Sequence, residues 1–186
     1  MSTLSTMDSI WMRKSCRDFT GESVDGGKLS MVATAGAYAA YSGQIQLTVV
    51  TNTDCIKAID DAVKKVLLAS KNKLLMEKAA QDDFSPSYHA PALIVISAPD
   101  SEDPTAVNLN YANAGCAAQN IMLAAMYFDL ASCCIATLDL AFHHTDLNIL
   151  CDIPDGFSPI LTVAIGKEDN TSPHDVRQVK NINFRR

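Results

Sequence analysis

The sequence predicts an α+β domain in which helices alternate with short strands. Two runs rich in β-branched residues, 45–50 and 157–165, predict strands. Residues 90–97 form a nearly continuous apolar run, which is typical of a strand covered on both faces. Between these runs, apolar residues recur at the spacing of helices. Because 186 residues is about the length of one domain, residues 1–186 are interpreted as a single domain with a polar C-terminal extension at 167–186.

The segments before residue 90 predict three helices. Residues 5–14 form a short helix, and a second helix spans residues 26–40 with Asp25 as its cap. Thr53 is expected to cap a third helix, which carries apolar residues on one side. Residues 81–89 are then expected to form a loop that leads into the buried strand.

The second half of the chain predicts one long buried helix and a final strand. Residues 113–128 carry small and medium apolar side chains all round, so this helix is expected to be buried. Residues 130–142 are interpreted as irregular or partly extended, and residues 146–151 as a short helix. A turn at residues 154–156 precedes the last strand, 157–165. The order of the strands does not follow from the sequence.

The composition argues against nucleic-acid and membrane partners. The formal net charge is −6, whereas polyanionic surfaces attract basic proteins. The longest apolar run, residues 121–128, is far shorter than the ~20 residues of a membrane span. The six cysteines form no Cys-x-x-Cys pair. Asp8 precedes any apolar run, so the sequence indicates no secretory signal. We therefore expect a cytoplasmic protein.

The basic segment at residues 13–17 is the first candidate for a binding site. Arg13, Lys14 and Arg17 lie close together, with Ser15 between them. Converging guanidinium, ammonium and hydroxyl groups are suited to binding a phosphate. An ordinary basic helix end, which the helix dipole favours, has the same composition. The segment alone leaves both interpretations open.

Two further polar pairs are candidates for ligand or metal contacts. Gln44 and Gln46 share one face at strand spacing, and amides both donate and accept, which suits a heterocycle with carbonyls and ring nitrogens. A solvated edge strand explains this pair equally well. His143 and His144 have no carboxylate or cysteine at ligand spacing, so no metal site is expected. Gly-x-Ser-x-Gly and Gly-x-Gly-x-x-Gly motifs are absent from the sequence. No motif therefore indicates a hydrolase or a dinucleotide-binding fold.

Taken together and in order, several segments resemble the nitroreductase family of FMN-dependent oxidoreductases. They are residues 10–19 (IWMRKSCRDF), 42–46 (SGQIQ), 90–95 (APALIV), 113–125 (NAGCAAQNIMLAA), 153–156 (IPDG) with Pro159, and 165–166 (IG). The first is similar to the family's opening basic motif, and the fourth is very close to its core helix. The resemblance implies a nitroreductase-like fold: a central mixed, mainly antiparallel sheet flanked by helices, with an FMN site at a homodimer interface.

The resemblance also implies which residues contact FMN. The basic segment would hold the phosphate, the ribityl chain and the ring edge. Polar residues from 42 to 46 would reach FMN largely from the partner subunit, and backbone N–H groups at 135–137 would approach flavin N5 and O4. A C-terminal basic residue would help to bind the phosphate. The complete expected set is Arg13, Lys14, Ser15, Arg17, Ser42, Gln44, Gln46, Ile135, Ala136, Thr137 and Arg177.

In such a site the cofactor carries out the chemistry, and no catalytic side chain is expected. Hydride would pass from NAD(P)H through flavin N5 to a small oxidant such as a nitroaromatic or a quinone. Two other functions stay open. One is another flavin chemistry on the same fold, such as dehalogenation or flavin handling. The other is a non-catalytic flavin-binding or thiol-redox protein that uses Cys133 and Cys134, which a depressed thiol pKa would favour.

Overall fold

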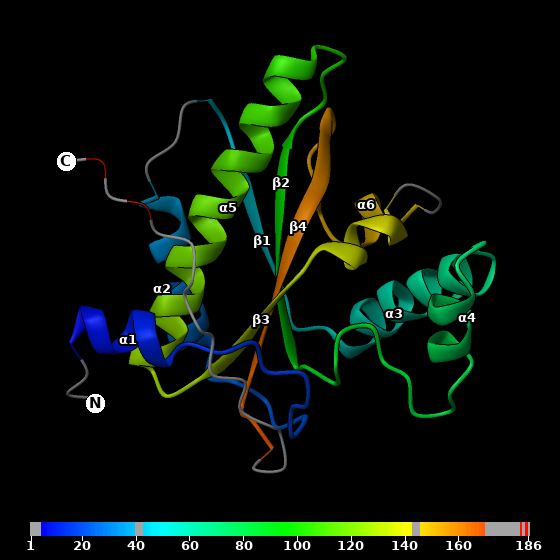
Figure 1. Ribbon diagram of the computed structural model, residues 1–186, viewed down its shortest axis with the longest axis horizontal. Coiled ribbons are helices and arrows are strands. Elements are labelled where there is room, and N and C mark those ends of the chain that lie inside the picture. Colours follow the sequence, from blue (N-terminus) through cyan, green and yellow to red (C-terminus); the bar gives the residue numbers. More distant parts are fainter. Residues whose placement is uncertain (1–4, 40–42, 143–145, 170–182, 184, 186) are drawn as a thin grey trace.

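A computed structural model describes residues 5–39, 43–142, 146–169, 183 and 185. One four-stranded sheet runs through the middle of the molecule, and helices cover both of its faces (Figure 1). The helices are α1 (Thr6–Met12), α2 (Gly26–Ala37), α3 (Thr53–Leu68), α4 (Lys73–Ala79), α5 (Pro104–Tyr127) and α6 (Leu147–Leu150), with a 3-10 helix η1 (Ala136–Ala141). The strands are β1 (Gln46–Val50), β2 (Ala92–Pro99), β3 (Ala131–Ile135) and β4 (Phe157–Gly166).

The strand order is β1-β2-β4-β3, and all three pairings are antiparallel. This arrangement confirms the expected α+β class with a mainly antiparallel sheet. The buried strands β2 and β4 form its centre, while β1 and β3 form its two edges. A register shift interrupts the β2–β4 pairing between Ile96 and Ser97.

Alternation along β2 divides the core into two halves. Leu93 and Val95 pack with α3, η1 and the inner side of β3. Ile94 and Ile96 point the other way and pack with α2 and α5. Such side-to-side alternation is the period of two that a strand imposes. Figure 1 shows the result, with α2 and α5 on one side of the sheet and α3, α4 and α6 on the other.

Side-chain caps explain where most helices begin. Asn52 caps α3, one residue before the predicted Thr53, and its Oδ1 accepts from the Asp54 and Cys55 amides. Asp103 caps α5 through the Thr105 amide, and Pro104 occupies the first turn, where its missing N–H costs nothing. The helix accordingly starts at Pro104 rather than at residue 113. The Asp-Pro pair marks this start in the sequence, but the polar first turns hide the apolar period.

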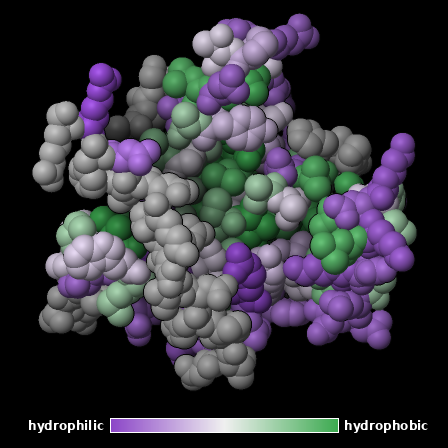
Figure 2. Space-filling model, in the orientation of Figure 1, coloured by the Kyte–Doolittle hydropathy of each residue, from purple (hydrophilic) through white to green (hydrophobic). Residues whose placement is uncertain are grey.

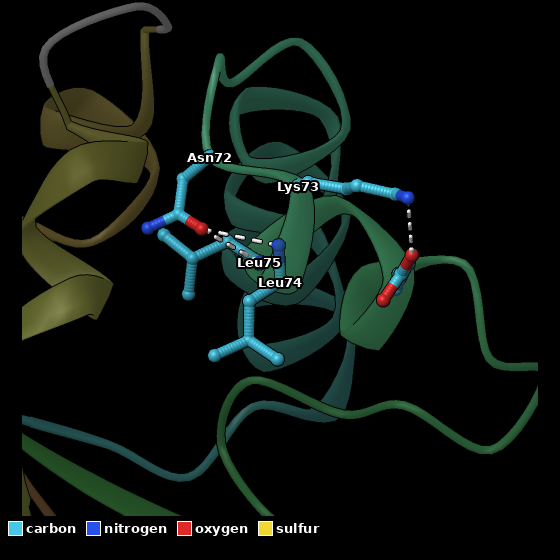
Figure 3. A network of polar contacts seen from close by, with 5 residues as sticks. Asn72, Lys73, Leu74 and Leu75 are labelled. Carbon is cyan, nitrogen blue, oxygen red and sulfur yellow. Dashed lines mark hydrogen bonds and ion pairs between the residues drawn. The ribbon is translucent and has the colours of Figure 1, made fainter.

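Helix α4 was not predicted, because its seven residues are too short to show a period. Its cap is Asn72, whose Oδ1 accepts from the amides of Leu74 (3.1 Å) and Leu75 (3.4 Å), as Figure 3 shows. The Lys73–Glu77 ion pair spans 3.7 Å between exposed groups, so it adds little stability. Figure 2 shows hydrophilic side chains over this side of the molecule, interspersed with exposed apolar residues such as Leu74. The cap therefore determines where α4 starts.

Strand β3 is a third difference in detail from the sequence-based expectation, which placed irregular or partly extended structure at residues 130–142. Its sequence (ASCCI) consists mostly of small residues with no clear alternation. Pairing with β4 from Ala131↔Gly166 to Ile135↔Thr162 makes it a strand, which is a tertiary contact.

Within the described residues, no helix is long and apolar enough to span a membrane. The predicted extension at 167–186 lies mostly outside the described residues.

Candidate functional site

The basic segment 13–17 lies along the outer edge of β3. The Cys16 amide donates to the Ser132 carbonyl oxygen on that strand (3.0 Å). Further on, Phe19 forms a bridge with Glu168, and the Thr20 amide donates to the Lys167 carbonyl oxygen (3.0 Å). These backbone contacts hold the segment beside the sheet. A basic sequence motif near the N-terminus therefore meets the last two strands of the chain.

Arg13 and Arg17 both lie close to β3. Cys133 belongs to the α3 half of the core and Cys134 packs on the α5 half. Burial raises the pKa of both thiols, while the positive charges of Arg17 and Arg13 partly oppose the shift at Cys133 and that of Arg13 opposes it at Cys134. Arg13 Nη1 also lies 3.9 Å from the sulfur of Met122 on α5. Two guanidinium groups are thus brought to the strand that leads directly into residues 135–137.

Residues 135–137 form the junction between β3 and η1. Ile135 is buried, whereas Ala136 and Thr137 are exposed. Among the described residues, no side chain caps the start of η1. Backbone N–H groups in such a first turn have no intrahelical partner. The structure therefore places donor groups at the end of the same strand that the two arginines flank.

Lys14 points to a carboxylate. Its ammonium pairs with Glu168, and both side chains are largely buried. Lys14 and Glu168 line a cavity of about 420 Å³ between α1, the end of α5 and β3. Ser15, the remaining polar member of the segment, is half-buried. Within the basic segment, Lys14 is therefore neutralised by Glu168, while the two arginines lie at β3.

The structure does not bring the two predicted amides to this site within one chain. Gln46 opens β1 and pairs with Ser97, and Gln44 is exposed just before it. Strands β1 and β3 are opposite edges of the sheet. Ser42 and Arg177, the other two predicted contact residues, lie outside the described residues, as do His143 and His144. Only a second copy of the chain could place Gln44 and Gln46 next to Arg13.

A loop that the sequence analysis did not assign to the site contacts Arg17. Burial raises the pKa of Tyr88, and the positive charge of Arg17 near its phenol partly opposes that shift. The Phe19 amide donates to the Tyr88 carbonyl oxygen (3.2 Å). No local pattern marks Tyr88 as a site residue, because its link to residue 17 is purely tertiary.

The same loop is strained. Tyr88 and His89 have φ angles of 58° and 61°, in the left-handed region that side chains with a Cβ rarely adopt. Each such residue costs about 1–3 kcal/mol and persists where the surroundings hold it. The Asp60 carboxylate on α3 supplies that support by accepting from Ser85 Oγ (2.7 Å) and from the Ser87 amide (2.9 Å). Desolvation nevertheless raises the pKa of Asp60.

Cys133 and Cys134 do not have the environment of a reactive thiol pair. None of the six cysteines, all of which the structure describes, is in a disulfide, and burial raises the pKa of Cys133 to about 11. Burial also raises the pKa of Cys134. A redox or nucleophilic cysteine requires the opposite shift, because the thiolate is the reactive form. In the part of the chain that the structure describes, no three His, Cys, Asp or Glu side chains come together as a metal centre requires.

Comparison with known proteins identifies the family. The model of the nitroreductase family matches residues 10–167. The chain belongs to the nitroreductase family. The match spans the basic segment, both central strands, α5 and the β3–η1 junction. No curated protein sequence matches the chain.

Solved nitroreductases share the fold over nearly the whole chain. One from Bacteroides fragilis, described as having bound FMN, is 25% identical, with a TM-score of 0.85 over 98% of this chain and 99% of its own. One from Desulfitobacterium hafniense, also described with bound FMN, is 22% identical, with a TM-score of 0.85 over 98% and 100%. A third, from a Sphingopyxis strain and described as FMN and NADPH-dependent, is 20% identical, with a TM-score of 0.73 over 97% and 99%.

Proposed function

We propose that this nitroreductase-family chain is an FMN-dependent oxidoreductase that acts as a homodimer in the cytoplasm. It would pass hydride from NAD(P)H to a small oxidant such as a nitroaromatic or a quinone. The observation that carries the proposal is the position of the basic segment, with Arg13 and Arg17, along the edge of β3, the strand that leads into the exposed Ala136 and Thr137. The relative from Bacteroides fragilis, which is described with bound FMN, supports the choice of cofactor.

The residues present fit a flavin nucleotide. Guanidinium groups recognise phosphate oxygens and anionic ring atoms, and two of them lie close to one strand, β3. Uncapped N–H groups at Ala136 and Thr137 can donate to a ring nitrogen and a carbonyl oxygen. When bound, FMN would supply the centre that accepts and returns hydride. The chain would supply the binding groups, the donors beside the ring and positive charge, which favours an anionic ring.

The position of Gln44 and Gln46 supports a dimeric site. Both lie at the β1 edge, across the sheet from Arg13. In a symmetric dimer, the β1 edge of one copy can complete the β3 edge of the other, which forms two equivalent sites. Helix α1 also exposes large apolar side chains that a second copy would cover. They are Met7, Ile10, Trp11 and Met12.

The proposed function is tested by a visible absorption spectrum. The purified protein is mixed with FMN, passed through gel filtration, and then titrated anaerobically with NADH and separately with NADPH. Retained flavin that either nucleotide bleaches, and that a nitroaromatic or quinone reoxidises, supports the proposal. Retained flavin that neither nucleotide reduces would indicate a non-catalytic binder or another electron donor. Protein that leaves the column without flavin would contradict the proposed function. Sedimentation of the loaded protein as a monomer would contradict the shared site.

A further inference from the structure

Arg17 is held at the β3 edge by a neighbouring loop. Residues 85–89, called here the anchored loop, precede β2 and contact the chain just after the basic segment. The Tyr88 carbonyl oxygen accepts from the Phe19 amide at 3.2 Å, two residues beyond Arg17. The positive charge of Arg17 also acts on the Tyr88 phenol, where it partly opposes the rise in pKa that burial causes. Tyr88 is half-buried while Arg17 is exposed, so the tyrosine is the more restricted of the two side chains.

Asp60 determines where the anchored loop lies. Its Oδ2 accepts from Ser85 Oγ at 2.7 Å and from Ser87 Oγ at 2.8 Å, while its Oδ1 accepts from the Ser87 amide at 2.9 Å. Ser85 Oγ in turn accepts from the His89 amide at 3.0 Å. These bonds enclose the two residues in the left-handed region, Tyr88 and His89. Without the carboxylate, the strained backbone would be free to relax, and the phenol would move with it.

We propose that Asp60 and Tyr88 are positioning residues for Arg17 and thereby for the flavin. The carboxylate holds the anchored loop, the loop holds the phenol, and the phenol restricts the guanidinium to the β3 edge. An unrestrained arginine loses side-chain entropy when it binds a ligand, so a guanidinium that is already restricted binds more tightly. The inference rests on the proposed function, since it requires Arg17 to contact FMN.

Two variants test the inference, each with a matched control. Tyr88→Phe removes the phenol oxygen and keeps the ring, and Asp60→Ala removes the acceptor of the anchored loop. The controls are Tyr111→Phe, at an exposed tyrosine of α5, and Asp61→Ala, at the exposed neighbour of Asp60. FMN dissociation constants come from quenching of flavin fluorescence. Midpoint potentials of the bound flavin and thermal unfolding curves are recorded for all five proteins. Amide hydrogen exchange is followed without FMN.

Both test variants are expected to weaken FMN binding by about three- to tenfold, as for partial loss of one polar contact that positions a charged group. The midpoint potential should become more negative, because a less restricted cation stabilises the reduced flavin less. In flavin-free Asp60→Ala, the amides of Ser87 and Phe19 should exchange faster than in Asp61→Ala. A merely structural role would change the unfolding temperature and leave the Tyr88→Phe potential unaltered.

The outcomes separate the inference from the proposed function. Wild-type protein that binds FMN, with both test variants matching their controls in affinity and potential, overturns the inference and leaves the function standing. Wild-type protein that retains no FMN overturns both. If Asp60→Ala does not fold, Tyr88→Phe alone decides between support and rejection, since it removes a single oxygen from a half-buried ring.

Discussion

Gly166→Ala is the substitution whose effect the structure specifies most closely. Gly166 ends β4, where the basic segment crosses the start of β2. A Cβ added at this glycine would lie 2.7 Å from Pro91 Cδ and 2.9 Å from Phe19 Cδ1. Both distances are far shorter than carbon–carbon contact, and a proline ring is too rigid to move aside alone. One methyl group should therefore displace the backbone of Phe19 or Pro91.

The expected magnitude follows from two opposing effects. Overpacking a well-filled site costs about 1–3 kcal/mol. Replacing a strand glycine by alanine recovers about 0.5–1 kcal/mol, because the unfolded chain loses freedom. The net loss in the free energy of unfolding is about 1–2 kcal/mol, which lowers the melting temperature of a domain this size by roughly 2–8 °C. Because Phe19 adjoins Arg17, FMN binding should weaken as well.

Circular dichroism melts of wild type, Gly166→Ala and Gly26→Ala check this expectation. Gly26 opens α2, and a Cβ there meets nothing within 4 Å. The control should melt at or slightly above the wild-type temperature. An unchanged or higher melting temperature for Gly166→Ala would show that Phe19 and Pro91 do not close around Gly166. The reasoning on tight packing at this crossing would then be wrong.

Three further predictions concern the site and the core. Arg13→Ala should raise the FMN dissociation constant about 10- to 100-fold through loss of a charge-assisted contact. The control Lys65→Ala on α3 should leave this constant unchanged. Equal flavin retention by the two variants would reject Arg13 as a ligand. Ile121→Ala, at a fully buried side chain, should cost about 2–5 kcal/mol in urea unfolding, and a loss under 1 kcal/mol would contradict the packing of α5 against α2. Burial raises the pKa of Cys133 and Cys151 to about 11 from an ordinary 9.0, so the unfolded chain releases these protons first, and stability should fall as the pH rises from about 9 towards 11. Urea midpoints that stay level across that range would exclude buried neutral thiols.

The alternation and apolar runs of the sequence predicted the central strands correctly, because burial on both faces imposes a continuous apolar run. The same analysis gave only irregular or partly extended structure where β3 lies, and started α5 at residue 113 instead of Pro104. In both cases the local signal is weak: β3 is a strand because β4 pairs with it, and the first turns of α5 are polar. Tertiary contacts override such local propensities.

For the candidate site too, part could be predicted from the sequence and part required the tertiary structure. The basic motif at 13–17 and the segment 135–137 could be proposed from sequence, since their residue types and order resemble a family. The resemblance implied that both contact one flavin, but the contacts that bring them together could not be predicted, because more than a hundred residues separate them and β3 forms through pairing with β4. The thiol-redox alternative for Cys133 and Cys134 also required structure, since burial sets the direction of a thiol pKa.

The sequence by itself determined the fold class, the buried strands and the family resemblance, because hydrophobic period and motif order are local properties of the chain. Only the tertiary structure decided that Gln44 and Arg13 lie on opposite edges of one sheet, that Lys14 is neutralised by Glu168, and that the Tyr88 carbonyl oxygen accepts from the Phe19 amide. Strand order and side-chain contacts depend on how distant segments pack, and no short stretch of sequence encodes that packing.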